Sequence, residues 1–324
     1  MRRTALLLSI CAWMAASVFA SDGARPPAPP PAPPDDAVCG TRGSPRDLEV
    51  IGLTADQRLV CFRENRPEGA RDIGPIVGLM GGEKLVGIDF RPANGKLYGL
   101  GSAAGIYTID PTDATATLVA RLVDASMMAV ALNGTSFGID FNPVPDRLRV
   151  VSDAGQNLRI NVDNGATTVD GALNPAPGTG VTGVGYTNND NDPNTLTVLY
   201  DIDTMNDQLS IQAPPNNGTL NPVGKLTVKN AVQDVGLGTG FDIFSRLRQV
   251  SAATAMTPQI NTTVEVRALA TLTVGMQTQV YRVNLVTGAI EPRGAFRSTD
   301  AVIDIGIPLV QGPGGPGSTG PDDD

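Results

Sequence analysis

Apolar positions alternate with glycine and aspartate in a six-residue phrase that recurs five times along the chain. The copies are LVGIDF at Leu85, SFGIDF at Ser136, VTGVGY at Val181, GTGFDI at Gly238 and VIDIGI at Val302. Alternation with a period of two is typical of a β-strand, and it recurs here at intervals typical of a repeat architecture. Strand-rich repeats of roughly 40 to 50 residues predict an all-β fold, a β-propeller.

Two further strands follow each phrase. The expected second strands are EVIGL at Glu49, KLYGL at Lys96, RLRVV at Arg147, TLTVLY at Thr195 and ALATLTV at Ala268. The expected third strands are RLVCF at Arg58, GIYTI at Gly105, NLRIN at Asn157, QLSIQ at Gln208 and VYRVNL at Val280. Turns rich in Asn, Asp and Gly come after the third strands. With a less regular fourth strand, each repeat supplies one propeller blade.

The two ends of the repeat array complement each other. The array begins at an expected second strand, at Glu49, with no first strand before it. It ends in a first strand, at Val302, with nothing after it. Joining the two completes a blade and removes exposed sheet edges, so we predict a closed ring of five blades. The alternative is an open solenoid of repeats.

Composition divides the chain into four expected segments. Residues 1–20 combine two arginines, an apolar run and small residues before a cleavage point after Ala20, as in a secretory signal peptide. Residues 21–47 form a Pro-rich linker, 48–310 the propeller, and 311–324 an acidic Gly/Pro tail that we expect to be disordered. We therefore expect export to the periplasm, the cell surface or the medium, without a transmembrane anchor.

The chain is acidic and poor in aromatic residues. Its formal net charge is −9 and its isoelectric point is about 4.6. This charge disfavours nucleic acids and anionic membranes, because both carry the same sign. Aromatic residues at 4% argue against a large stacking platform for carbohydrate or nucleic acid. We expect a monomer with a protein or small-molecule partner whose identity the sequence does not give.

Two cysteines, Cys39 and Cys61, remain after removal of the expected signal peptide. In an oxidising compartment an isolated pair forms a disulfide more often than a metal or redox site. That bond would close a loop of about 20 residues and stabilise the fold by about 3 kcal/mol on the chain-entropy model.

The chain contains no histidine. This absence excludes Ser-His-Asp and Cys-His catalysis, imidazole bases and His-ligated zinc. No complete catalytic constellation is present, so we do not expect an enzyme. Any catalysis would rest on carboxylates, lysine, tyrosine or a bound hard metal.

Three aspartates, Asp89, Asp140 and Asp242, occupy the same position in three of the five phrases. If the first strands line the propeller axis, these carboxylates could ring the channel and hold Ca²⁺ through oxygen ligands. The simpler interpretation, which we prefer, is that each carboxylate caps a turn or accepts a backbone N–H of a neighbouring blade. Gly185 and Gly306 interrupt the ring at the matching positions of the other two phrases.

A second acidic group, Asp190, Asp192 and Asn194, lies at alternate positions in the loop TNNDNDPN. The spacing is similar to that of calcium loops, but the following Gly and the distal Glu of an EF-hand are missing. We prefer a solvated hairpin loop here. DIDTMND, which begins at Asp201, is interpreted in the same way, as a turn between two strands.

Three arginines, Arg147, Arg149 and Arg159, alternate with apolar residues in two neighbouring strands. They could form an anion-binding patch on one face of the blade. The preferred interpretation is that they pair with aspartates between blades.

The chain resembles the bacterial domain-of-unknown-function family 4394. The segments that carry the resemblance are GLTADQRLVCF from Gly52, GIDFRPANGKLYGLGSAAGIYTIDP from Gly87, TSFGIDFNPVPDRLRVVSDAGQNLRIN from Thr135, TLTVLYDIDTMNDQLSIQAPPNNGTLNPVG from Thr195 and YRVNLVTGAI from Tyr281. The resemblance covers about residues 48–308 and implies an exported propeller-like domain without catalytic residues to transfer. A Thr/Gln/Ala-rich stretch at 246–263 departs from the family as an insertion, expected at one mouth of the ring and open to partner contacts.

These observations favour an exported, non-catalytic binding propeller. The alternatives are a Ca²⁺-dependent, lactonase-like hydrolase that uses axial Asp and Asn, and a structural component of the envelope or matrix. Propellers present loops on two rims around a rigid ring, which suits recognition.

Overall fold

A computed structural model describes residues 47–175, 180–189, 195–251, 260–297 and 301–311. These residues all belong to one compact unit of the chain, 36–324. The expected signal peptide, most of the Pro-rich linker, Cys39, the loop at 190–194 and all of the acidic tail after Gln311 lie outside the described residues.

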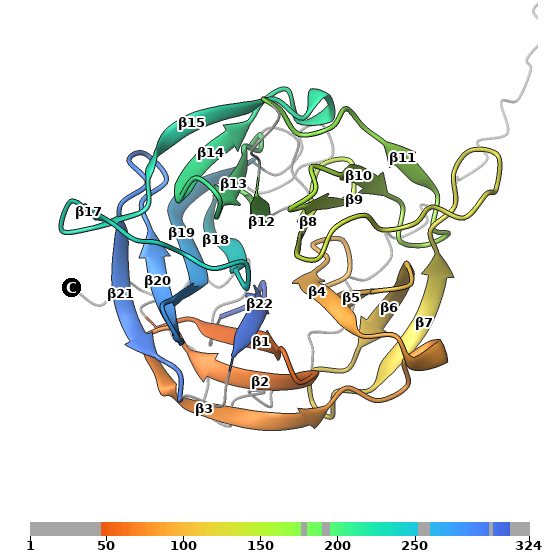
Figure 1. The fold of residues 1–324 in the computed structure, drawn as a ribbon, viewed down its shortest axis with the longest axis horizontal. Coiled ribbons are helices and arrows are strands. Elements are labelled where there is room, and N and C mark those ends of the chain that lie inside the picture. Colours follow the sequence, from red (N-terminus) through yellow and green to blue (C-terminus); the bar gives the residue numbers. More distant parts are fainter. Residues whose placement is uncertain (1–46, 176–179, 190–194, 252–259, 298–300, 312–324) are drawn as a thin grey trace, which may run out of the picture. The chain divides into compact units, whose positions relative to one another are not determined.

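Five four-stranded antiparallel sheets stand around a central axis as the blades of a propeller (Figure 1). Their strands, from the axis outward, are β22 (Val302–Gly306), β1 (Glu49–Thr54), β2 (Arg58–Arg63) and β3 (Arg66–Pro75) in blade 1; β4 (Leu85–Phe90), β5 (Leu97–Gly101), β6 (Gly105–Ile109) and β7 (Ala116–Arg121) in blade 2; β8 (Phe137–Asn142), β9 (Arg147–Ser152), β10 (Asn157–Ile160) and β11 (Thr167–Val169) in blade 3; β12 (Val181–Tyr186), β13 (Leu199–Asp203), β14 (Gln208–Gln212) and β15 (Leu220–Lys225) in blade 4; and β18 (Gly240–Ser251), β19 (Ile260–Val274), β20 (Gln277–Val283) and β21 (Ile290–Ala295) in blade 5. The prediction of a five-bladed β-propeller is therefore confirmed.

Short elements complete the described structure. A two-stranded ribbon, β16 (Thr227–Val228) with β17 (Ala231–Val232), lies between blades 4 and 5 in sequence. Two 3-10 turns, η1 (Met80–Gly82) and η2 (Pro215–Asn217), are the helical elements of the described residues. Neither of them has the length or apolar character to cross a membrane.

The ring closes where the last strand meets the first. β22 pairs with β1 in antiparallel register, with Leu53 opposite Asp304. Beyond β22, the Gln311 side chain accepts the Glu49 amide at 2.8 Å and donates to the Glu49 carbonyl at 3.0 Å. Blade 1 therefore combines strands from both ends of the array, as the missing and orphan strands predict, and the open solenoid is wrong.

Glycine recurs in the first-strand phrase because these strands crowd together at the axis. A Cβ atom on Gly138 would lie 2.8 Å from the backbone nitrogen of Val184. One on Gly240 would lie 2.7 Å from the Cα atom of Asp304. Both contacts are with backbone of the next blade, which a rotamer change would not relieve, so larger residues would force the blades apart.

The core consists of apolar clusters between neighbouring blades, and these clusters differ in size. Four of the interfaces hold 11 to 13 buried apolar residues each. Between blades 3 and 4 the cluster has seven, namely Val151, Leu173, Val181, Val184, Tyr186, Leu199 and Leu220. Polar side chains occupy much of this one interface.

Two segments differ from their expected form. The second strand of blade 4 begins at Leu199 instead of Thr195, and Asp201 lies inside it instead of in a turn. Asp201 therefore faces an interior that the sequence pattern did not indicate. The described ends of the insertion, 246–251 and 260–263, extend β18 and β19, which pair with Arg246 opposite Glu265.

Turns group on two rims of the ring. The turns from the first to the second strand and from the third to the fourth strand of a blade lie on the same rim. We call this rim the front rim; residues 307–311, which follow β22, also belong to it. On the front rim lie the β8–β9 turn, the β14–β15 turn that contains η2, and the base of the β18–β19 hairpin. Both cavities described below are lined by residues at this rim.

Candidate functional site

The axial aspartates fasten neighbouring blades to one another. Asp89 Oδ2 accepts the Phe141 amide of blade 3 at 2.7 Å. Asp140 in turn accepts the Tyr186 amide of blade 4. Asp242 Oδ2 accepts the Ile307 amide of blade 1 at 2.6 Å. These contacts bear out the preferred interpretation, in which the carboxylates bond a neighbouring blade.

A fourth carboxylate, Asp304, acts in the same way from a position two residues earlier in the first strand of its blade. Its Oδ2 accepts the Ile88 amide of blade 2 at 2.7 Å, and its Oδ1 accepts the Ile305 amide at 2.9 Å. Gly87 leaves it room, because a Cβ atom there would lie 2.9 Å from Asp304 Oδ2. The sequence aligned Asp304 with Gly87, and the two positions meet because one supplies the carboxylate and the other the space.

Three of these carboxylates also lie close to one another. Oxygens of Asp89, Asp140 and Asp242 fall within 4.8 Å, and all three residues are buried. Burial raises the pKa of Asp89 and of Asp140 well above the ordinary value, and the neighbouring carboxylates raise both further. Burial raises the pKa of Asp242 to about 6, against the lowering effect of its two amide donors. Like charges at this spacing favour shared protons.

A small cavity adjoins this carboxylate group at the front rim. Its volume is about 10 Å³, which is about the room that one water molecule needs. Three carboxylates around so small a space would also suit a hard cation. The amide bonds already give each carboxylate a structural partner, so calcium binding here stays a prediction from the sequence.

The second metal prediction and the disulfide remain predictions as well. Asp190, Asp192 and Asn194 lie outside the described residues. Cys61 is buried in β2, and the expected partner Cys39 is outside the described part of the chain.

A larger cavity, of about 200 Å³, lies between blades 3 and 4. We call it the arginine cavity; it is lined by Asn142, Pro145, Arg147, Arg149, Arg159, Tyr186, Pro215 and Asn216. Arg147 and Arg149 are two apart in β9, and Arg159 is directly opposite Arg149 in β10, so the three share one face of the sheet. The structure thus brings the three predicted arginines together at a blade interface.

Arg149 is the structural member of this group. Its guanidinium donates to Asp170 and Asn157 at 2.7 and 2.8 Å, and to Asn216 of blade 4 at 2.9 Å. The side chain is 2% exposed. Its Nε also donates to the Tyr186 hydroxyl at 3.4 Å. Arg149 therefore pairs with an aspartate that follows the last strand of its own blade, and it reaches blade 4 through the neutral side chains of Asn216 and Tyr186. The predicted pairing of these arginines with aspartates of a neighbouring blade stays a prediction.

Arg159 and Arg147 are less fully engaged. Arg159 Nη2 donates to Asp170 at 3.0 Å, while its Nε is buried without a hydrogen-bond partner among the described residues. Arg147 Nη1 donates to the carbonyls of Pro145 and Asp146 at 3.1 and 2.7 Å, both in its own turn. Neither contact gives Arg147 a carboxylate partner.

The charges around the arginine cavity do not balance. Arg149 and Arg159 share the one carboxylate of Asp170. The next carboxylates, Asp146 and Asp163, are both held by Arg91 of blade 2. Among the described residues that form these ion pairs and line the cavity, four arginines therefore face three aspartates, and the surplus positive charge lies at the cavity.

Asp201 is buried on the blade 4 side of the same interface. Both of its carboxylate oxygens lack a hydrogen-bond partner among the described residues. Burial raises the pKa of Asp201 well above its ordinary value, and the nearby Arg149 opposes this rise. Burial therefore favours the neutral form of this carboxyl group. The sequence pattern did not indicate that Asp201 is buried, because it placed the start of this strand at Thr195 instead of Leu199.

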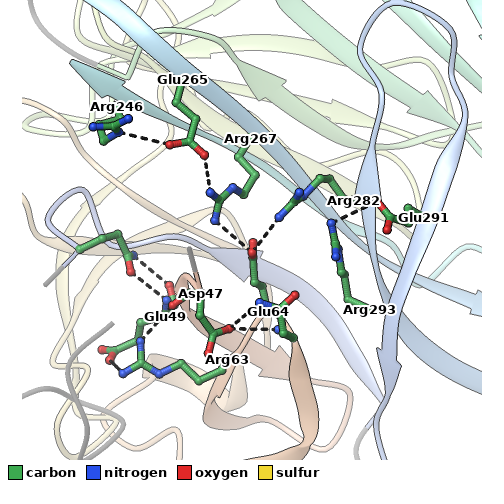
Figure 2. A network of polar contacts seen from close by, with 12 residues as sticks. Asp47, Glu49, Arg63, Glu64, Arg246, Glu265, Arg267, Arg282, Glu291 and Arg293 are labelled. Atoms are coloured by element: carbon green, nitrogen blue, oxygen red, sulfur yellow. Dashed lines mark hydrogen bonds and ion pairs between the residues drawn. The ribbon is translucent and has the colours of Figure 1, made fainter. Parts of the chain in front are cut away.

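A second arginine group joins blades 5 and 1 (Figure 2). Glu64, in the β2–β3 turn of blade 1, is fully buried, and its Oε1 accepts hydrogen bonds from Arg267 and Arg282 of blade 5 at 3.0 and 2.9 Å. Glu265 bridges Arg267 to Arg246 on the neighbouring strand. The sequence analysis did not single out Glu64, Arg267 or Arg282, although RLRVV and VYRVNL place arginines at related positions.

Comparison with solved structures finds matches of low similarity. A nidogen/laminin complex structure is 9% identical, with a TM-score of 0.41, and the match covers 81% of this chain and 99% of that one. Auxiliary nutrient binding proteins of Bacteroides thetaiotaomicron and Bacteroides ovatus are 12% and 16% identical, with TM-scores of 0.39 and 0.34. These matches cover 75% and 54% of this chain, and 56% and 46% of theirs. Likeness at this level carries no functional argument.

No curated protein matches the chain. Residues 58–306 match the family described as domain of unknown function DUF4394. The match spans all five blades and most of the chain, in agreement with the resemblance of its long phrases. The protein is a member of the DUF4394 family.

Proposed function

We propose that this protein is an exported, non-catalytic binding propeller that holds a small anion in the arginine cavity between blades 3 and 4. The carrying observation is the surplus of positive charge in that cavity. Arg149 and Arg159 share Asp170, and the hydrogen bonds of Arg147 within the described part of the chain all go to backbone carbonyls. A ligand that brings a negative charge would complete the hydrogen bonding of Arg147 and Arg159. Charge-assisted hydrogen bonds to arginine are among the stronger polar contacts.

The size and setting of the cavity favour a small ligand. Its volume of about 200 Å³ is below the roughly 300–1,000 Å³ of sites for drug-sized molecules. The chain as a whole carries a net charge of −9, which repels polyanions such as nucleic acids. A compact anion can enter a local positive site that a long polyanion would approach only against this charge.

The lining of the cavity supports binding without chemistry. The described residues that line it include no Ser, Cys, Asp or Glu, and the chain has no histidine. Burial raises the pKa of the Tyr186 hydroxyl, so this group stays protonated and is a poor base at neutral pH. The lactonase-like alternative would need the axial carboxylates, which are occupied by backbone amides.

Export enters this proposal from the signal-peptide pattern of residues 1–20. A binding protein outside the cytoplasm would meet small metabolites directly. The envelope-component alternative shares this location, but it offers no role for a charged cavity.

Anion titration tests the proposal. Differential scanning fluorimetry and calorimetric titration would compare succinate, phosphate and sulfate with neutral glucose, in a buffer free of other oxyanions. We expect at least one anion to raise the Tm and to bind, and glucose to do neither. Arg147→Gln should weaken the binding about tenfold, as expected for one lost charge-assisted contact.

Arg66→Gln is the matched control, because Arg66 is exposed on the outer strand of blade 1. It removes the same charge from the protein without touching the cavity, and should bind anions as the wild type does. Equal weakening in both variants would indicate general charge attraction and would contradict a site in the cavity. The absence of any anion binding would overturn the proposal.

A further inference from the structure

We propose that the arginine cavity is a carboxylate site for a small organic acid, and that Glu64 at the blade 5–blade 1 interface is its built-in counterpart. The inference rests on the proposed function, because it names the chemical class of the anion that the cavity takes. Two interfaces of the ring carry arginines at two equivalent positions and differ in what neutralises them. The third arginine of the cavity, Arg149, has Leu269 at the equivalent position of blade 5.

The register of the two blades makes the arginines equivalent. In blade 3, Arg147 lies opposite Asn142, two residues after the axial Asp140. In blade 5, Arg267 lies opposite Phe244, two residues after the axial Asp242. Arg147 and Arg267 therefore stand at the same position of the second strand.

The third strands agree. Arg159 lies opposite the residue that pairs with Asp140, and Arg282 lies opposite the residue that pairs with Asp242. Both side chains carry a buried Nε without a hydrogen-bond partner among the described residues. Arg159 and Arg282 therefore match in position and in environment.

At the blade 5–blade 1 interface a protein carboxylate lies between the two arginines. Glu64 comes from the turn between the third and fourth strands of the next blade, and its Oε1 accepts from both Arg267 and Arg282. The side chain is fully buried. This interface shows that the paired arginines bind a carboxylate where the chain supplies one.

At the blade 3–blade 4 interface the corresponding turn carries no acid. Residues 213–219 read APPNNGT, and Asn216 is the residue of this turn that reaches the arginines, by accepting from Arg149 at 2.9 Å. Where blade 1 places a glutamate, blade 4 therefore places a neutral amide beside a cavity of about 200 Å³. The space and the surplus charge together match an added carboxylate.

Carboxylate fits better than phosphate for two reasons. The counterpart in the same fold is a planar carboxylate, whose oxygens suit the flat arginine fork. The described residues around the cavity carry a surplus of one positive charge, since four arginines face three aspartates, whereas phosphate groups bring about two negative charges at neutral pH. A single carboxylate group balances the surplus.

Replacement of Asn216 tests the inference. Asn216→Asp supplies an acid from the same turn that holds Glu64 in blade 1, and Asn217→Asp adds the same charge one residue further on, at an exposed side chain. Calorimetric titration would measure acetate, succinate, sulfate and phosphate on the wild type and both variants at equal ionic strength.

We expect acetate to bind the wild type and Asn217→Asp more tightly than sulfate and phosphate do. Succinate should also bind more tightly than these two anions, with one carboxylate in the cavity and its second negative charge in solvent. Asn216→Asp should raise the Tm and weaken carboxylate binding about tenfold or more, because its own carboxylate occupies the arginines. Preferred binding of sulfate or phosphate, blocked by the same variant, would overturn the carboxylate class and leave the anion proposal standing. No binding of any of the four anions would overturn both.

Discussion

The Asp304 carboxylate accepts the backbone amide of Ile88, although 216 residues separate the two in sequence. The bond joins the strand contributed by the C-terminal end of the array to the first strand of blade 2. It belongs to a series in which the carboxylate of one blade holds an amide of the next. The ring is therefore held at its axis by buried hydrogen bonds from backbone amides to these aspartates, in addition to the strand pairing of blade 1.

Removal of this carboxylate should weaken the closed ring. Asp304→Ala leaves the buried amides of Ile88 and Ile305 without their acceptor, at a cost of about 1–3 kcal/mol for each. Urea unfolding should show a total loss of about 2–5 kcal/mol. Asp234→Ala, at an exposed side chain, is the control and should change the free energy of unfolding by less than about 0.5 kcal/mol. Equal stability of the two variants would contradict the role of Asp304.

The axial carboxylates predict that stability falls as the pH rises. Their folded pKa values are raised, to about 6 for Asp242, so the folded state binds protons more tightly than the unfolded state. The stabilisation is complete below the unfolded pKa of about 3.9 and is lost as the pH rises through the folded values. We expect the wild-type Tm to decrease between pH 4 and 7.

Asp140→Asn tests this origin of the pH dependence. The amide oxygen can still accept the Tyr186 amide, and the change removes one of three clustered charges. The variant should have a higher Tm than the wild type at pH 7 and a flatter pH profile. An unchanged slope would contradict the account, and a calcium-induced rise in wild-type Tm that this variant abolishes would place a cation among the carboxylates instead.

Arg149 and Arg147 should separate stability from binding. Arg149→Met leaves the buried Asp170 with one arginine partner instead of two, and loss of a buried ion pair costs about 3–5 kcal/mol. Arg147→Gln loses only contacts to backbone carbonyls and should change the free energy of unfolding by less than about 1 kcal/mol. Urea unfolding of both variants measures this difference. A larger loss for Arg147→Gln than for Arg149→Met would show that the two roles have been assigned the wrong way round.

Glu64→Ala should turn the blade 5–blade 1 interface into an acetate site. The change leaves Arg267 and Arg282 without their shared carboxylate and should cost about 3–5 kcal/mol. Acetate has the size of the group that is removed, so it should restore part of the lost Tm, while chloride at equal ionic strength should not. Glu291→Ala, whose side chain is 66% exposed, is the control and should show neither effect. A failure of acetate to rescue a folded Glu64→Ala protein would contradict the use of Glu64 as a counterpart.

The fold could be predicted from the sequence because its signals are local and repeated. The phrase around Gly138 marks a crowded first strand, and the orphan strand at Val302 shows that the ring must close. The site was predictable only in part. The alternation at Arg147 and Arg149 placed these two side chains on one face of the blade. The sequence around them did not show that the facing turn of the next blade lacks an acidic residue. That information depends on a turn more than 60 residues away, around Asn216.

Glu64 illustrates the same limit from the other side. It lies in a two-residue turn and has no periodic pattern of its own, so it reads as a solvent-exposed acid. Its burial arises because blade 5, encoded about 200 residues later, closes over it with two arginines. Contacts between the first and last blades of a ring join residues that are far apart in sequence. The alternation of residues within one strand therefore cannot predict them.

A crystal structure grown in the presence of succinate tests the central claim most directly. We expect electron density for one succinate carboxylate in the arginine cavity, within hydrogen-bond distance of Arg147 or Arg159 and beside Asn216. Water alone in that cavity at saturating succinate, or succinate bound only elsewhere on the protein, would contradict the assignment of the site.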